Sequence, residues 1–115
     1  MTLEAVANRL VELCREGKFS AAVEELYGED IVSVEPQGEP REVQGMEAIR
    51  GKLDWFGTTF DIKEVSIEGP WINEPCFLVR FTIQCTMKSN GEPCPMDEYA
   101  LYTCHEGKIV HERFF

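Results

Sequence analysis

Residues 77–88 read FLVRFTIQCTMK, and every second side chain from Phe77 to Met87 is apolar. The intervening positions are polar from Arg80 onwards. Because successive side chains of a β-strand point to opposite faces of a sheet, this pattern predicts a strand with one buried and one polar face. An antiparallel sheet with one covered face is therefore the expected frame of the fold.

Further strands are expected on both sides of this one. An Asn-Gly pair at 90–91 and a Glu-Gly pair at 106–107 are typical of tight turns between antiparallel strands. The segment before residue 77 ends in a Gly-Pro pair and carries alternating apolar residues. The additional strands are predicted over residues 62–68, 96–104 and 108–115.

The first half of the chain shows helical spacing instead, with apolar residues at steps of three and four. Thr2 can cap a first helix, and Gly17 suits its C-terminal end. A second helix is predicted to begin at Ser20 as N-cap and to end at Gly28. Gly45 precedes a third helix. A β-rich segment at 31–35 and a polar loop at 37–44 separate the second and third helices. Helices followed by antiparallel strands predict an α+β domain, with the helices packed on one face of a bent sheet.

The chain of 115 residues is expected to form one domain, residues 1–115, of ordinary globular composition. No stretch has the length of a membrane span, and the N-terminal residues lack the basic start of a signal peptide, so the cytoplasm is the expected location. The net charge of −10 argues against nucleic acid as a partner. Five scattered cysteines without a CxxC pair argue against a disulfide framework and a zinc site.

Acidic residues occupy positions where a covered sheet face should be apolar. In residues 96–104, Glu98 shares a face with Ala100 and Tyr102, and the last strand can present Glu112 and Phe114 to the same side. A carboxylate on an apolar face must be paired, hydrogen-bonded, protonated or exposed to a wet cavity. The pattern therefore predicts a pocket that contains acidic groups.

The register of the last strand is left open by the sequence. A strict two-residue loop at 106–107 would place His111 and Arg113 beside Glu98. A three-residue loop with Gly107 in the left-handed conformation would place Glu112 there instead. Both versions leave apolar residues on the covered face.

The order of these elements resembles the SnoaL-like branch of the nuclear-transport-factor-2-like superfamily. The likeness rests on three helices, a short strand ending in Val34-Glu35-Pro36, a helix led by Gly45, and Gly107-Lys108-Ile109-Val110 opening the last strand. The resemblance implies a cone-shaped, curved antiparallel sheet wrapped around three N-terminal helices, a cystatin-like roll with a cavity. It also implies a homodimer formed through the outer sheet face, where Arg80, Gln84, Tyr99 and Arg113 are expected to lie.

The functional residues of the superfamily carry over only in part. Glu35 occupies the place of the proton-shuttling carboxylate of ketosteroid isomerases, just before a proline. Leu10 or Val11 and Ala100 stand where those isomerases have oxyanion donors, and without such donors steroid-type isomerisation loses a large stabilising contribution. Phe114 stands where SnoaL-like cyclases carry a catalytic aspartate. The resemblance also favours the register in which Glu112 faces the cavity.

Each carboxylate keeps a structural alternative. Glu35 is either a general acid or base at the cavity or a strand-end carboxylate bound to backbone amides or Arg41. Glu98 and Glu112 either share a proton, which would raise one pKa, or are bridged to Arg50, Lys52 or another base. A metal ion held by the three carboxylates is not expected.

Two functions remain as hypotheses. The first is binding of a small organic molecule in an acidic, partly apolar cavity, with cofactor-independent acid–base chemistry of the isomerase, dehydratase or cyclase type. In it Glu35, Glu98 and Glu112 are the catalytic groups, and the expected ligand contacts are Tyr102, Phe114, Trp55, Phe81 and Ile83. The second is a non-catalytic ligand-binding or dimerisation module with structural glutamates. An unpaired carboxylate with a raised pKa in the cavity would favour the first.

Overall fold

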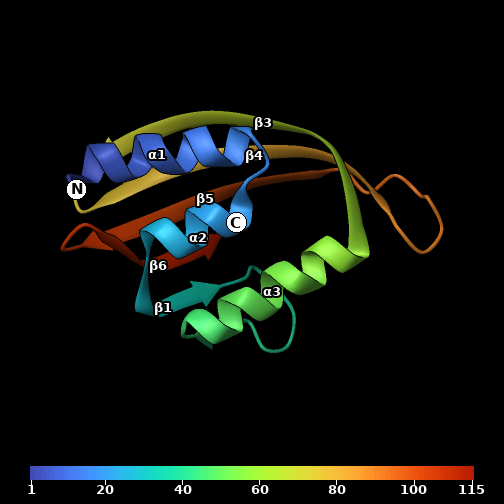
Figure 1. Ribbon diagram of the computed structural model, residues 1–115, viewed down its shortest axis with the longest axis horizontal. Helices are drawn as coiled ribbons and strands as arrows, with labels where there is room; N and C mark the ends of the chain where they lie inside the picture. Colours follow the sequence, from blue (N-terminus) through green and yellow to red (C-terminus); the bar gives the residue numbers. More distant parts are fainter.

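The computed structural model describes residues 1–115 as three helices and one six-stranded sheet (Figure 1). The helices are α1 (Leu3–Arg15), α2 (Phe19–Leu26) and α3 (Met46–Thr59). The strands are β1 (Tyr27–Val34), β2 (Glu42–Gln44), β3 (Phe60–Asn73), β4 (Cys76–Met87), β5 (Met96–His105) and β6 (Lys108–Phe114). The predicted α+β class is confirmed. The loop expected between the second and third helices contains the short strand β2.

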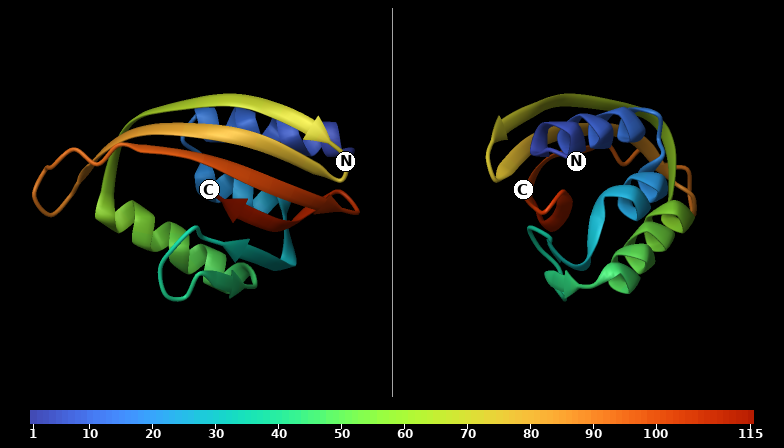
Figure 2. Two further views of the ribbon diagram at one scale, coloured as in Figure 1. Left: turned by 180° about the vertical axis from the view of Figure 1, so that it is seen from behind. Right: turned by 60° about the vertical axis from the view of Figure 1, so that its left-hand side comes forward.

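The strands form one curved sheet in the order β2-β1-β6-β5-β4-β3. Neighbouring strands run antiparallel except β1 and β6, which are parallel, so the sheet is mixed where the sequence suggested only antiparallel strands. The right-hand view of Figure 2 shows the sheet as an open arc, with α1 beneath β3 and β4 and with α2 and α3 on the open side. This is the cone-like shape that the family resemblance implied.

The inner face of β4 supplies much of the core. Phe77, Val79, Phe81, Ile83 and Cys85 are all buried, as the alternation in residues 77–88 predicts. They lie against the apolar face of α1, and Phe77 stacks on a tyrosine of β5. Burial of these side chains on one face is what holds the helices to the sheet.

The N-terminal ends of the first two helices were predicted from capping residues, with different outcomes. Thr2 caps α1 as predicted, since its Oγ1 accepts a hydrogen bond from the amide of Ala5 at 3.1 Å. The prediction of Ser20 as N-cap of the second helix is wrong. The helix begins at Phe19, and Lys18 precedes it without a side-chain cap. The partly buried ring of Phe19 packs against the core in the first turn of this helix.

The register of β6 differs from both loops considered for residues 106–107, because a two-residue turn is followed by a bulge. Glu106 and Gly107 both have positive φ, 49° and 76°, and form a two-residue turn that pairs His105 with Lys108. The register then shifts by one residue at Val110. Because of this bulge, Glu112 lies opposite Tyr102 on the covered face.

None of the three helices combines the length and the apolar character needed to cross a bilayer.

Candidate functional site

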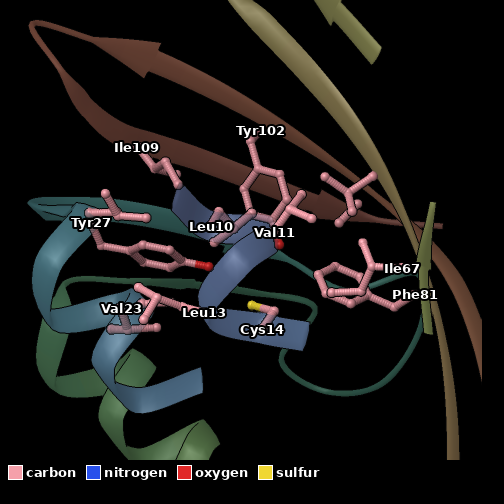
Figure 3. Packing of buried hydrophobic residues seen from close by; sticks show 14 of the residues in the cluster. Leu10, Val11, Leu13, Cys14, Val23, Tyr27, Ile67, Phe81, Tyr102 and Ile109 are labelled. Atoms are coloured by element: carbon pink, nitrogen blue, oxygen red, sulfur yellow. The ribbon is translucent and has the colours of Figure 1, made fainter. Parts of the chain in front are cut away.

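An inner cavity of about 160 Å³ lies between the curved sheet and the three helices. Thirteen of its seventeen lining residues are hydrophobic, and the four exceptions are three glutamates and one lysine. Figure 3 shows part of this interior, where the hydroxyl ends of Tyr27 and Tyr102 point toward the same space beside Leu10 and Cys14. The complete lining consists of Leu10, Cys14, Phe19, Ala22, Val23, Tyr27, Glu35, Ile49, Lys52, Leu53, Phe56, Phe81, Ile83, Glu98, Tyr102, Glu112 and Phe114.

Glu112 is the most deeply buried of the three carboxylates, with only 3% of its surface exposed. Parallel pairing of β1 with β6 places Ser33 directly beside it. The hydroxyl of Tyr27 donates to Oε1 of Glu112, and Oγ of Ser33 donates to Oε2 at 2.8 Å. Burial raises the pKa of Glu112, while the hydrogen bonds from Tyr27 and Ser33 act in the opposite direction.

Tyr27 is suited to its role as a hydrogen-bond donor. Burial, and then the negative charge of Glu112, raise the pKa of Tyr27 well above its ordinary value, so the phenol keeps its proton. The carboxylate of Glu112 is therefore held in place by two hydroxyl groups of β1. These contacts make Glu112 part of the structural support of the cavity wall.

Lys52 of α3 links the second carboxylate to this network. Its Nζ lies 2.5 Å from Oε1 of Glu35 and donates to Oγ of Ser33 at 2.8 Å. The same ammonium lies 5.4 Å from the centre of the Phe114 ring. The side chains of Lys52 and Glu35 keep about a third of their surface exposed, 31% and 34%, which places this ion pair at the mouth of the cavity.

Glu98 differs from both of these glutamates because its carboxyl group forms no hydrogen bond and no ion pair in the structure. It lies opposite Phe81 of β4, on the partly buried inner face of β5. The pKa of Glu98 is raised to about 7. Burial is the largest cause, the negative charges of Glu35 and Glu112 act in the same direction, and Lys52 opposes them. At neutral pH this carboxyl group therefore exists in both its protonated and its ionised form.

Most of the residues selected from the sequence come together here. Glu35, Glu98 and Glu112 line one cavity, as do Tyr102, Phe81, Ile83 and Phe114. The expectation that Trp55 contributes to the cavity is wrong, since Trp55 is 61% exposed and packs edge-on against Phe60. The cavity face of α3 carries Ile49, Lys52, Leu53 and Phe56. Trp55 lies outside this spacing of three and four residues and points away from that face.

The hypotheses for pairing of the carboxylates also change. Both oxygens of Glu112 accept hydrogen bonds from hydroxyl groups, so Glu112 and Glu98 do not form a hydrogen-bonded pair. Arg50 bonds Glu24 on the surface, at 2.7 Å, and does not reach the cavity. Arg41 contacts the backbone oxygen of Glu35 and not its carboxylate. Of the suggested bases, Lys52 is the one that meets a cavity glutamate.

Two polar residues of the site were missed in the sequence. Ser33 lies two positions before Glu35, on the same face of β1 as the buried Ile31, and this spacing was a usable signal. Tyr27 carried no such signal, because it lies at the junction of α2 and β1 and its partner is 85 positions away in the chain.

Replacing Lys52 with methionine is expected to raise the pKa of Glu98 above its value of about 7. The substitution removes the one positive charge that lowers this pKa, and we expect a rise of up to about one unit. Titration of the glutamate side-chain carboxyl signals by carbon NMR measures it. The control is Lys63→Met, which removes a charge from an exposed ion pair with Asp61. An unchanged or lower pKa of Glu98 in the Lys52 variant would show that the charge of Lys52 does not lower this pKa.

No group of three or more histidine, cysteine, aspartate or glutamate side chains is arranged to hold a metal ion.

The outer face of the sheet carries a separate charged cluster. Arg80 bonds both oxygens of Asp97, at 2.9 and 2.8 Å, and its guanidinium lies 5.7 Å from the ring of Tyr99.

The family model described as "SnoaL-like domain" matches residues 1–115 of the chain. Among solved structures, a protein from Mesorhizobium loti that is named as a SnoaL-like polyketide cyclase is 37% identical. The alignment covers 100% of this chain and 99% of that chain, with a TM-score of 0.94. No curated protein sequence matches the chain.

More distant structures share the fold alone. A Bacillus subtilis protein named as an isomerase is 18% identical with a TM-score of 0.77, and the match covers 99% of this chain and 88% of that chain. A Pseudomonas putida protein named as a polyketide cyclase is 14% identical with a TM-score of 0.76, covering 100% of this chain and 91% of that chain.

Proposed function

Because the chain belongs to the SnoaL-like domain family, we propose that it binds a small organic molecule in the inner cavity and transfers a proton through Glu98. The observation that carries this proposal is the state of Glu98. It is the one cavity glutamate without a partner, it stands among apolar side chains, and its pKa is about 7. A carboxyl group that titrates near the working pH is suited to act as both acid and base.

The three glutamates have different environments, and this difference supports different roles. Hydroxyl groups hold Glu112, and the ammonium of Lys52 holds Glu35. Neither can take up or release a proton without giving up these contacts. We therefore move the proton-carrying role, which the sequence suggested for Glu35, to Glu98. Glu35 and Lys52 line the entry, Glu112 supports the wall, and Tyr102 borders the space in which the ligand lies.

The size of the cavity limits the ligand. A volume of about 160 Å³ is close to that of an engineered apolar cavity that holds benzene, so a molecule with a single ring fits. Cyclisation, the activity in the name of the 37% identical protein, commonly begins with removal of a proton from a carbon atom next to a carbonyl group. Proton transfer next to a carbonyl group is accordingly the reaction class we propose, and it requires no cofactor.

The test is hydrogen–deuterium exchange in small cyclic ketones, with and without an amino substituent. The protein is dissolved in deuterated buffer at pH 7, and proton NMR follows the loss of signal at the carbon next to the carbonyl. The proposal predicts exchange faster than in buffer with an equal concentration of acetate and faster than with the Glu98→Gln variant. If the ketones bind but none of them shows exchange, the catalytic part of the proposal is wrong.

A non-catalytic ligand-binding module is the second candidate. It is favoured because Glu35 forms an ion pair with Lys52 and Glu112 accepts hydrogen bonds from hydroxyl groups. These contacts give two of the three glutamates a structural role. The two candidates differ in what happens after binding, because the module binds ring-sized molecules and leaves their carbon-bound hydrogens in place. The exchange experiment therefore separates them.

We further propose that the protein forms a homodimer through the outer sheet face and acts in the cytoplasm. Tyr99 on that face is 40% exposed, and it lies beside the charged pair of Arg80 and Asp97. All five cysteines are free, which suits a reducing compartment. Light scattering during size-exclusion chromatography tests the dimer, and a Tyr99→Glu variant that remains dimeric would place the interface elsewhere.

A further inference from the structure

The charges around the inner cavity are unbalanced. Its lining contains the carboxyl groups of Glu35, Glu98 and Glu112 but one ammonium group, that of Lys52. No arginine or histidine lines the cavity. When all three carboxyl groups are ionised, the site carries an excess of two negative charges, which no side chain in the lining balances.

The single ammonium group is already engaged. Nζ of Lys52 lies 2.5 Å from Glu35 and 2.8 Å from Ser33, so two of its three hydrogen atoms have acceptors. Glu98, in contrast, has both of its oxygens without a hydrogen-bond donor. Among the charged groups of the lining, the one that remains without a partner is therefore Glu98, which accepts hydrogen bonds in its ionised form.

The apolar part of the lining also suits a cation. The rings of Phe56, Phe81 and Phe114 belong to the cavity wall together with those of two tyrosines. Aromatic rings attract ammonium groups through their negative faces, and the 5.4 Å approach of Lys52 to the ring of Phe114 is an example within this site. An anionic ligand would meet three carboxyl groups at the same wall.

We propose that the natural ligand is a small, mainly apolar carbonyl compound that carries an amino group, bound as its ammonium ion with N–H groups donated to Glu98. The proposal rests on the proposed function, because it names the class of molecule that enters the same cavity. The apolar body of the ligand lies among the phenylalanine and tyrosine rings. The ammonium group offsets one of the two negative charges that Lys52 leaves unbalanced.

Binding of such a cation is linked to release of a proton. The charged or titratable groups that face Glu98 are Glu35 from the end of β1, Lys52 from α3, and Tyr102 and Glu112 from β5 and β6. At pH 6 most of Glu98 carries a proton and has one free oxygen fewer to offer, since its pKa is about 7. The amine stays charged across this range, so its affinity rises from pH 6 to pH 8.

The experiment is calorimetric titration of the full chain with three ring-sized probes at pH 8, namely benzylamine, benzyl alcohol and benzoate. We expect benzylamine to bind at least about tenfold more tightly than benzyl alcohol, as a charge-assisted hydrogen bond predicts, and benzoate to bind most weakly. The amine affinity increases with pH between 6 and 8, while the alcohol affinity stays constant. Titrations in two buffers of different ionisation enthalpy report the proton released.

Variants assign the effect to one side chain. Glu98→Gln is expected to remove most of the preference for benzylamine over benzyl alcohol and to leave binding of the alcohol in place, which also shows that the variant is folded. Glu92→Gln removes a negative charge from an exposed position outside the cavity lining and should keep the preference.

The outcomes separate this inference from the function on which it rests. Equal affinity for the amine and the alcohol, or tighter binding of benzoate, overturns the ligand class and leaves a cavity that binds small molecules. A preference for the amine that persists in Glu98→Gln overturns the assignment to Glu98. Failure of all three probes to bind overturns both the inference and the binding function.

Discussion

Replacing Glu98 with glutamine is expected to abolish proton transfer in the cavity. Glutamine keeps the shape of the side chain but cannot take up or release a proton at neutral pH. A positioned acid or base typically contributes about 10²–10⁴-fold to the rate, so exchange in the variant should fall by about that factor. The measurement is the NMR exchange rate in cyclic ketones, for the wild type and the variant at equal concentrations.

The same substitution is expected to stabilise the fold at alkaline pH. The pKa of Glu98 is about 7 in the folded chain, against an ordinary value of 4.5. Between these two values the folded state holds a proton that the unfolded state has lost, so unfolding releases a proton and rising pH favours it. The contribution of Glu98 to wild-type stability therefore falls from pH 4.5 to pH 7, by on the order of 2 kcal/mol after allowance for its partial exposure.

Urea denaturation of both proteins between pH 4 and pH 8 measures this effect. The two free energies of unfolding should be similar at pH 4, and the Glu98→Gln variant should be the more stable protein at pH 8. The control Glu92→Gln removes an exposed carboxylate and should follow the wild-type curve. A Glu98→Gln variant that is less stable than the wild type at pH 8 would mean that the glutamate has a stabilising partner. Greater stability together with lost exchange is the pattern expected of a residue kept for function.

Replacing Tyr27 with phenylalanine is expected to destabilise the protein by about 2 kcal/mol, because a buried carboxylate loses one of its two hydrogen-bond donors. Tyr27 and Glu112 are 9% and 3% exposed, so water cannot readily replace the lost hydroxyl group. The ring itself is retained, which limits the change to the hydrogen bond. The free energy of unfolding in urea at pH 8 gives the magnitude.

The control is Thr58→Val, which removes an exposed hydroxyl group that donates a hydrogen bond to the backbone oxygen of Trp55. Its effect is expected to stay within about 0.5 kcal/mol, as for most surface substitutions. Titration of Glu112 offers an independent reading, because loss of the Tyr27 donor should raise the pKa of that carboxyl group further. Equal losses of stability in the Tyr27 variant and the control would remove Tyr27 from the support of Glu112.

The lining of the cavity was predictable where it depends on a single strand. Phe81, Ile83 and Glu98 face inward because two-residue alternation within β4 and β5 assigns each position to a face. The position of Trp55 could have been excluded in the same way, by counting steps of three and four from Ile49 along α3. These are local properties that neighbouring residues in the chain decide.

The place of Glu112 depended on contacts that no local pattern contains. The bulge at Val110 shifts the pairing of β6 with β5 and turns Glu112 inward. The parallel pairing of β6 with β1 then brings Ser33 beside Glu112, 79 positions later in the chain. A shift of one residue would have turned the opposite face of β6 inward. Sequence spacing was compatible with both registers.

The sequence by itself determined the order of helices and strands, the covered face of β4 and the presence of acidic side chains on an otherwise apolar face. Periodicity and turn residues encode these features, since each depends on neighbours within a few positions. Only the tertiary structure decided which glutamate has a partner. The hydroxyls of Tyr27 and Ser33 reach Glu112, Lys52 reaches Glu35, and Glu98 is left alone. Distance between side chains of different elements sets these pairs, and that distance follows from packing of the whole chain.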